Sequence, residues 1–141
     1  MIKQALLLLF ALNLALANLT DEGQTAYDAG DEQRAAKIWQ KACEAGEARG
    51  CARIGFLYQS GKGVEQDDAK ASKLYEKACD AGELSGCNTL ASLHQNSGEH
   101  AKAAALRQKA QKLHEKECEA ELAKKCMEFK KSTNKGEKHE F

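Results

Sequence analysis

The chain has 141 residues, with 21 basic and 21 acidic side chains, six cysteines and no proline. A formal net charge of zero argues against nucleic acid as the main partner, because binding to phosphates needs a basic face. Aromatic residues make up only 6% of the chain, which favours thin layers of small helices over one thick core.

Residues 1–17 have the features of a cleavable secretory signal peptide. Lys3 supplies a short positive region, residues 5–12 are apolar, and an A-x-A cleavage site ends at Ala17. The apolar run is too short for a membrane span, which needs roughly 20 residues, so we expect no stable membrane anchor. An uncleaved anchor is the alternative. Cleavage would start the mature chain at Asn18 and export it to the periplasm or the medium, where disulfides form.

The six cysteines form three pairs, each with seven residues between its two members. The first two pairs lie 36 residues apart and the third follows after 39, a period typical of stacked copies of one helical unit. Each pair spans a junction between units, and six is an even number, so we expect one disulfide at each junction. The expected disulfides are Cys43–Cys51, Cys79–Cys87 and Cys118–Cys126.

The first copy has a short turn at Gly30–Asp31 before the segment that ends at Cys43. The second copy shows the unit most clearly, because apolar residues recur at three- and four-residue intervals on both sides of a longer turn. Gly61 and Gly63 can adopt positive φ in this turn. Asp67 is a good N-cap for the helix that follows. The unit is therefore predicted to be an αα-hairpin, two antiparallel helices joined by a turn.

A glycine directly precedes the second cysteine of the first two pairs, at Gly50 and Gly86. A residue without a side chain lets two helix ends approach closely enough for a sulfur bridge. In the third pair, Lys125 replaces this glycine, and the preceding helix is predicted to be seven residues longer. We therefore expect the third disulfide to be the first that a reductant opens.

The residue pattern near the C-terminus predicts a capping helix followed by a tail. Leu122, Cys126 and Phe129 share one helical face and can cover the open end of the stack. Residues 131–141 are polar and basic, and we expect them to be disordered. The repeat domain is expected over residues 18–130, with about three helix pairs and the capping helix.

This pattern resembles the Sel1-like repeat, a relative of the tetratricopeptide repeat, and more narrowly the cysteine-rich repeat proteins of the Helicobacter type. The residues that carry the resemblance are Cys51, Gly55, Tyr58, Gly61, Gly63, Val64, Asp67, Lys70, Ala71, Tyr75, Ala78, Cys79, Gly82, Gly86 and Cys87. The resemblance implies an all-α solenoid of αα-hairpins, wound as a right-handed superhelix with a concave groove and stapled by disulfides. Members of that family are described as penicillin-binding proteins or weak β-lactamases.

A catalytic constellation is not visible in the sequence. Serine β-lactamases need S-x-x-K together with supporting motifs, and the one S-x-x-K here, Ser132 to Lys135, lies in the expected tail without K-T-G or S-D-N. The histidines are dispersed, and no C-x-x-C is present, so we expect no metal and no cofactor. The sequence does not identify catalytic residues for β-lactam hydrolysis. The four histidines are His94, His100, His114 and His139.

Binding along the concave groove is the alternative to catalysis. Tetratricopeptide-type facing would place five residues there, namely Phe56, Gln59, Asn88, Ser92 and Gln95. Their amides could bond an extended peptide backbone while Phe56 supplies an apolar contact. The competing interpretation is that Phe56 packs on a neighbouring helix and the polar groups face water.

The sequence is therefore compatible with two functions. The first is an exported, disulfide-rich binding module of the bacterial cell envelope, whose partner is a peptide or an envelope protein. A periplasmic chaperone for nascent clients cannot be separated from it by sequence. The alternative, implied by the resemblance alone, is a weak β-lactamase or penicillin-binding protein that acts on a β-lactam or a cell-wall fragment.

Overall fold

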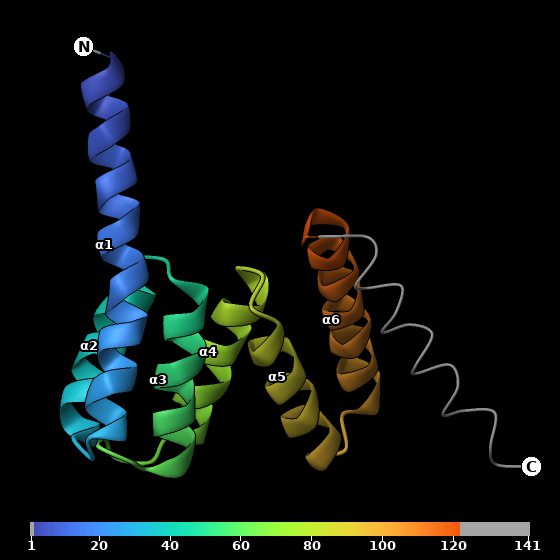
Figure 1. Ribbon diagram of the computed structural model, residues 1–141. Coiled ribbons are helices and arrows are strands. Elements are labelled where there is room, and N and C mark those ends of the chain that lie inside the picture. The colour runs from blue at the N-terminus through green and yellow to red at the C-terminus, as the bar shows by residue number, and fades with distance from the viewer. Residues whose placement is uncertain (1, 122–141) are drawn as a thin grey trace, which may run out of the picture.

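The computed structural model describes residues 2–121, which form six α-helices joined by short turns. Figure 1 shows them side by side as three antiparallel pairs, with the first part of α1 projecting beyond its neighbours. Each helix packs on its neighbours in the chain. In addition, α3 contacts both α1 and α5, so that the first helices of the three hairpins form one layer. The helices are α1 (Ile2–Asp28), α2 (Glu32–Glu44), α3 (Ala48–Ser60), α4 (Asp68–Asp80), α5 (Leu84–Asn96) and α6 (His100–Glu121).

The second helices of the first two hairpins begin at aspartate N-caps. The Asp31 carboxylate accepts from the backbone N–H of Arg34 at 3.1 Å, and Asp67 accepts from Lys70 at 2.9 Å. Such caps stabilise a helix by about 1 kcal/mol, because they satisfy an N–H group that has no partner within the helix. The N-cap predicted at Asp67 is confirmed.

The turn between α3 and α4 lies against α2. Gly61 and Gly63 both have positive φ, +66° and +69°. A Cβ added at Gly63 would lie 2.4 Å from the backbone carbonyl of Glu32. The turn can therefore sit this close to α2 only because it has no side chain at that position.

Two disulfides join the end of one hairpin to the start of the next. The bonds Cys43–Cys51 and Cys79–Cys87 connect α2 to α3 and α4 to α5, with Cα atoms 4.4 and 4.6 Å apart. A Cβ on the glycine before the second cysteine would collide with an alanine of the preceding helix, at 2.6 Å for Gly50. The close approach expected at these glycines is therefore present. Closing a loop of this length removes roughly 2–3 kcal/mol of unfolded-state entropy per bond.

The centre of the core is Trp39 on α2, which is 1% exposed. Its ring lies directly over Gly23 of α1, where an added Cβ would be 2.3 Å from Nε1. Ile54 and Leu57 of α3 are also fully buried and continue the core into the second hairpin. Glycine at position 23 is thus required by the close contact with the indole ring.

The predicted fold class, an all-α solenoid of αα-hairpins stapled by disulfides, is confirmed over the described residues. Residues 122–141 lie outside them, and with them Cys126 of the third predicted disulfide, the capping stripe and the S-x-x-K motif. The bounds of the signal peptide, the repeat domain and the tail therefore stay predictions. Within residues 2–121, none of the helices combines the length and apolarity that crossing a membrane requires.

Candidate binding cleft

A cleft of 330 Å³ lies between α3 and α5, in the layer formed by the first helices of the hairpins. Residues of α3 form one side, residues at the start of α5 form the other, and a tyrosine of α4 lies at its base. The lining residues are Arg49, Ala52, Arg53, Phe56, Tyr75, Glu83, Ser85 and Thr89.

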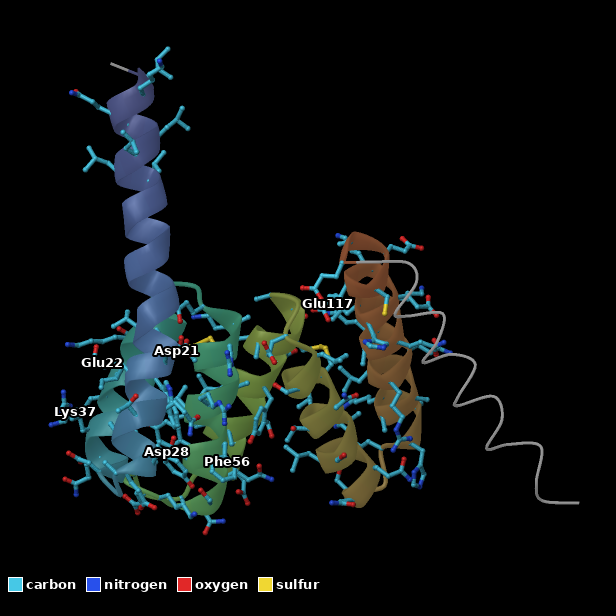
Figure 2. The ribbon with its side chains drawn as sticks, viewed as in Figure 1. Asp21, Glu22, Asp28, Lys37, Phe56 and Glu117 are labelled. Carbon is cyan, nitrogen blue, oxygen red and sulfur yellow. A yellow bond between two sulfur atoms is a disulfide. The ribbon has the colours of Figure 1, made fainter. Side chains whose placement is uncertain are left out.

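Phe56 combines packing with exposure. Its ring meets that of Tyr27 edge to face, with centroids 6.4 Å apart, yet 41% of the residue remains exposed. Figure 2 shows it on the outside of α3. The ammonium of Lys62 lies 5.6 Å from the Tyr27 ring centroid and 5.9 Å from that of Phe56. Phe56 thus belongs both to the lining of the cleft and to an adjoining aromatic pair with a cation nearby, a surface that suits apolar and anionic groups.

The cation beside this aromatic pair is held by a hydrogen bond. The Lys62 ammonium donates to the Tyr27 hydroxyl at 3.1 Å, and this bond raises the pKa of Lys62 above its ordinary value. Lys62 is thus charged over the whole physiological pH range.

Two arginines give the cleft an excess of positive charge. The Arg53 guanidinium lies 5.9 Å from the centroid of the Trp39 ring. The guanidinium of Arg49 has neither a hydrogen bond nor an ion pair with any described residue. The one carboxylate of the lining, Glu83, accepts a hydrogen bond from the Ser85 hydroxyl at 2.6 Å. Arg53 likewise has no hydrogen bond or ion pair with a described residue, but it contacts the Trp39 ring, whereas Arg49 has no such contact.

The base of the cleft is neutral. Burial raises the pKa of Tyr75 to about 12, so its hydroxyl stays protonated at neutral pH. That hydroxyl donates to Oε1 of Gln59 at 2.8 Å.

Of the five residues predicted for the groove, Phe56 lines the cleft. Gln59 is bonded to Tyr75, as described above. The Gln95 amide contacts His100 and Arg107 of α6, at 2.8 and 3.3 Å. These two amides bind neighbouring helices, and both side chains are only partly exposed.

The other two predicted residues, Asn88 and Ser92, are exposed on α5. The Ser92 hydroxyl donates to the backbone carbonyl of Asn88 at 3.1 Å, and neither residue lines the cleft. Thr89, one residue further along the same helix, lines it instead. A shift of one residue turns a helical side chain by about 100°.

Arg49 was missed by the sequence analysis, although a signal for it exists. Arg49, Arg53 and Phe56 stand at i, i+4 and i+7, the spacing of one helical face. Extending that face backwards from Phe56 would have found both arginines.

The histidines with described partners have local contacts. The His94 ring lies 3.2 Å from a Glu99 carboxylate oxygen at the turn between α5 and α6, and Glu99 also pairs with Lys102. The hydrogen bonds from Lys102 and His94 lower the pKa of Glu99. Across residues 2–121, His, Cys, Asp and Glu side chains nowhere gather in a group of three that could hold a metal ion.

Comparison with known proteins gives two findings. The family model named Sel1 repeat matches residues 11–47 and 48–83. A stretch of 45 residues is 38% identical to a Helicobacter pylori (strain J99) protein named "Putative beta-lactamase HcpE". That stretch covers 32% of this chain and only 13% of the relative, so the similarity concerns a small part of the longer protein.

Proposed function

Since the chain belongs to the Sel1 repeat family, we propose that it is a protein-binding module that holds an extended segment of a partner protein in the cleft between α3 and α5. Repeats of this architecture present the first helices of their hairpins as a continuous surface for partners. The cleft volume of 330 Å³ is at the lower end of the range for ligand pockets, and it suits one or two side chains rather than a whole folded domain.

The chemistry of the lining suggests which segment would fit. Phe56 offers an exposed ring at the mouth, and Arg49 offers a guanidinium without a partner among the described residues. A guanidinium binds a carboxylate through two parallel hydrogen bonds. A segment with an acidic side chain next to an apolar one would use both groups. The observation that carries this proposal is that the exposed Phe56 lines the same cleft as Arg49, whose guanidinium has no partner among the described residues.

The place of action that we propose is the bacterial cell envelope, reached by export and cleavage after Ala17. Two disulfides are consistent with an extracytoplasmic location, because cytoplasmic thiols are kept reduced. The side chains of residues 2–9 are exposed, whereas Thr20 is buried and bonded to Trp39 of α2. A mature chain starting at Asn18 would therefore keep the contacts of Thr20, Gly23 and Ala26 with the core.

The proposal is tested by affinity capture from a periplasmic extract on the immobilised, oxidised chain. An Arg49→Ala, Phe56→Ala double variant is compared with an Asn88→Ala variant, which changes an exposed residue outside the cleft. We expect the double variant to lose a partner that the wild type and the control both retain. Equal capture by all three proteins would remove the cleft from the proposal, provided that circular dichroism shows the same helical content.

A second candidate function is weak β-lactamase or penicillin-binding activity. It is favoured by the name of the Helicobacter pylori relative. Turnover of a chromogenic cephalosporin by the oxidised chain, with a reduced and unfolded control, separates it from the first. Saturable hydrolysis that disappears on unfolding would favour an enzyme. The binding proposal predicts no turnover at high protein concentration.

A further inference from the structure

A second and larger groove, of 650 Å³, lies between α2 and α4 with α3 as its floor. It is on the other side of α3 from Phe56. Ile54 in its floor and Phe56 in the cleft are two residues apart, which separates their side chains by about 200° around the helix. The groove is lined by Gln33, Ala36, Lys37, Gln40, Lys41, Glu44, Ile54, Tyr58, Gly63, Val64 and Lys70.

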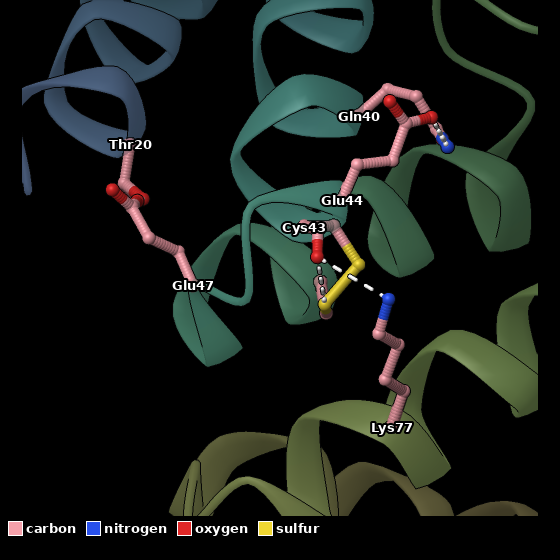
Figure 3. The surroundings of a disulfide bond; sticks show 7 residues. Thr20, Gln40, Cys43, Glu44, Glu47 and Lys77 are labelled. Carbon is pink, nitrogen blue, oxygen red and sulfur yellow. Dashed lines mark hydrogen bonds between the residues drawn. A yellow bond between two sulfur atoms is a disulfide. The ribbon is translucent and has the colours of Figure 1, made fainter. Parts of the chain in front are cut away.

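The floor of the groove is apolar and its ends are bounded. Ile54 belongs to the core around Trp39, and Val64 and Tyr58 are partly buried and pack against that core. The turn at Gly63 rests on α2 and bounds one end. Near the other end, the Lys77 ammonium donates to the carbonyl of Cys43 at 3.3 Å, beside the first disulfide (Figure 3). Its volume lies within the range of small-molecule sites, and the groove is open to solvent along its length.

Lysines stand on both walls of this groove. From α4, the Lys70 ammonium donates to the Tyr58 hydroxyl at 2.8 Å and lies 4.2 Å from the centroid of that ring. These two contacts hold the cation beside the apolar floor. From α2 come Lys37 and Lys41, and Figure 2 shows Lys37 on the outside of that helix, away from Phe56.

The two lysines of α2 are not neutralised within the described part of the chain. Lys37 and Lys41 stand at i and i+4, and their ammonium groups have no ion pair or hydrogen bond there. Like charges at this spacing destabilise a helix slightly. The one carboxylate in the lining, Glu44, accepts a hydrogen bond from the Gln40 amide at 2.8 Å. The groove thus has three cations against one acid around an apolar floor.

We propose that this groove is a second binding site, for a small amphiphilic carboxylate. The apolar body of the ligand would lie on the partly exposed Tyr58 and Val64, above the buried Ile54, and its carboxylate would lie between the α2 lysines and Lys70. The hydrocarbon stems of the lysines would extend the apolar surface while their ammonium groups stay at the rim. The site is independent of the cleft proposed for a partner protein, because it uses the other side of α3.

The test is isothermal titration of the oxidised chain with dodecanoate below its micelle concentration. We expect saturable binding of one molecule per chain, and markedly weaker binding of dodecanol, which has the same tail without the charge. A Lys37→Gln, Lys41→Gln variant should bind dodecanoate at least about fivefold more weakly, since it loses two charge contacts.

The matched control is a Lys112→Gln, Lys116→Gln variant, which removes two exposed lysines with the same i, i+4 spacing from α6. It should bind dodecanoate like the wild type. Three results would overturn the proposal: no saturable binding, equal binding of dodecanol, or equal weakening in both double variants. All four substitutions are at exposed helical positions, and a thermal melt of each variant verifies its fold.

Discussion

The indole Nε1 of Trp39 donates a hydrogen bond to the backbone carbonyl of Thr20 at 3.0 Å. This bond ties α1 to the buried indole ring of α2. The side-chain hydroxyl of the same residue, Thr20, donates to the Glu47 carboxylate at the start of α3 (Figure 3). Thr20 therefore connects three helices. It lies three residues after the predicted cleavage site, so the contact would survive removal of the leader.

The contact between α1 and α2 gives a prediction for Gly23. A Gly23→Ala substitution places a Cβ against the buried Trp39 ring, which has no room to move. We expect a loss of about 1–3 kcal/mol in the free energy of unfolding, the usual cost of overpacking. Guanidinium denaturation followed by Trp39 fluorescence measures it. Thr25→Ala, at an exposed position of the same helix, should leave the midpoint nearly unchanged.

The turn against α2 provides a matched pair of substitutions. Gly61 and Gly63 have nearly the same positive φ, so alanine at either position costs about 1–2 kcal/mol of backbone strain. Only at Gly63 does the new Cβ also collide with backbone, that of Glu32. Gly63→Ala should therefore lower the unfolding free energy clearly more than Gly61→Ala. Equal losses in a denaturation experiment would show that the turn does not rest on α2 in solution.

The second disulfide should contribute measurably to stability. A Cys79→Ala, Cys87→Ala variant lacks the cross-link between α4 and α5 and should unfold about 2–3 kcal/mol more easily. Denaturant titration of the oxidised proteins gives this difference. As the control, the variant and the wild type are compared again after full reduction. The difference should then largely vanish, and its persistence would mean that packing, not the cross-link, causes the loss.

The order in which the cysteines react with a reductant is a separate prediction. Cys43, Cys51, Cys79 and Cys87 are each at most 2% exposed, whereas Cys118 on α6 is only partly buried. We expect graded reduction followed by alkylation and mass spectrometry to label Cys118 and Cys126 first. Earlier labelling of either buried pair would contradict the expectation that access controls the order.

The turn between α5 and α6 should make a small pH-dependent contribution. The pKa of Glu99 in the folded chain lies below the ordinary value of 4.5, because its carboxylate accepts from Lys102 and His94. Its contribution is therefore present above pH 4.5 and is lost as the pH falls through the folded-state pKa. Glu99→Gln should destabilise the chain at pH 6 and lose that effect as the pH falls through the folded-state pKa of Glu99. Glu76→Gln, at an exposed position of α4, serves as the control across the same series of denaturation curves.

Local features of the fold were readable because they depend on residues close in sequence. The spacing of Cys43 and Cys51, the glycine before Cys51 and the cap at Asp67 each act within eight residues or fewer. The pairing of helices into hairpins follows from the same local signals. Such features need no knowledge of how one hairpin is rotated against the next.

The candidate site was only partly readable, because it depends on that rotation. Gln59 looks like a free amide in the sequence, but Tyr75, 16 residues later, takes up its oxygen. Thr89 rather than Asn88 faces the cleft, a difference of one position along α5 that periodicity alone does not fix.

The sequence by itself determined the repeat, the two described cross-links and the hairpin turns, since each is set by residue spacing and backbone preference. The tertiary structure alone decided that Arg49 shares a cleft with Thr89 and that Lys37 and Lys70 face one groove. The physical reason is that these pairs lie on different helices, and the packing of side chains such as Trp39 and Tyr75 sets how those helices are turned against each other.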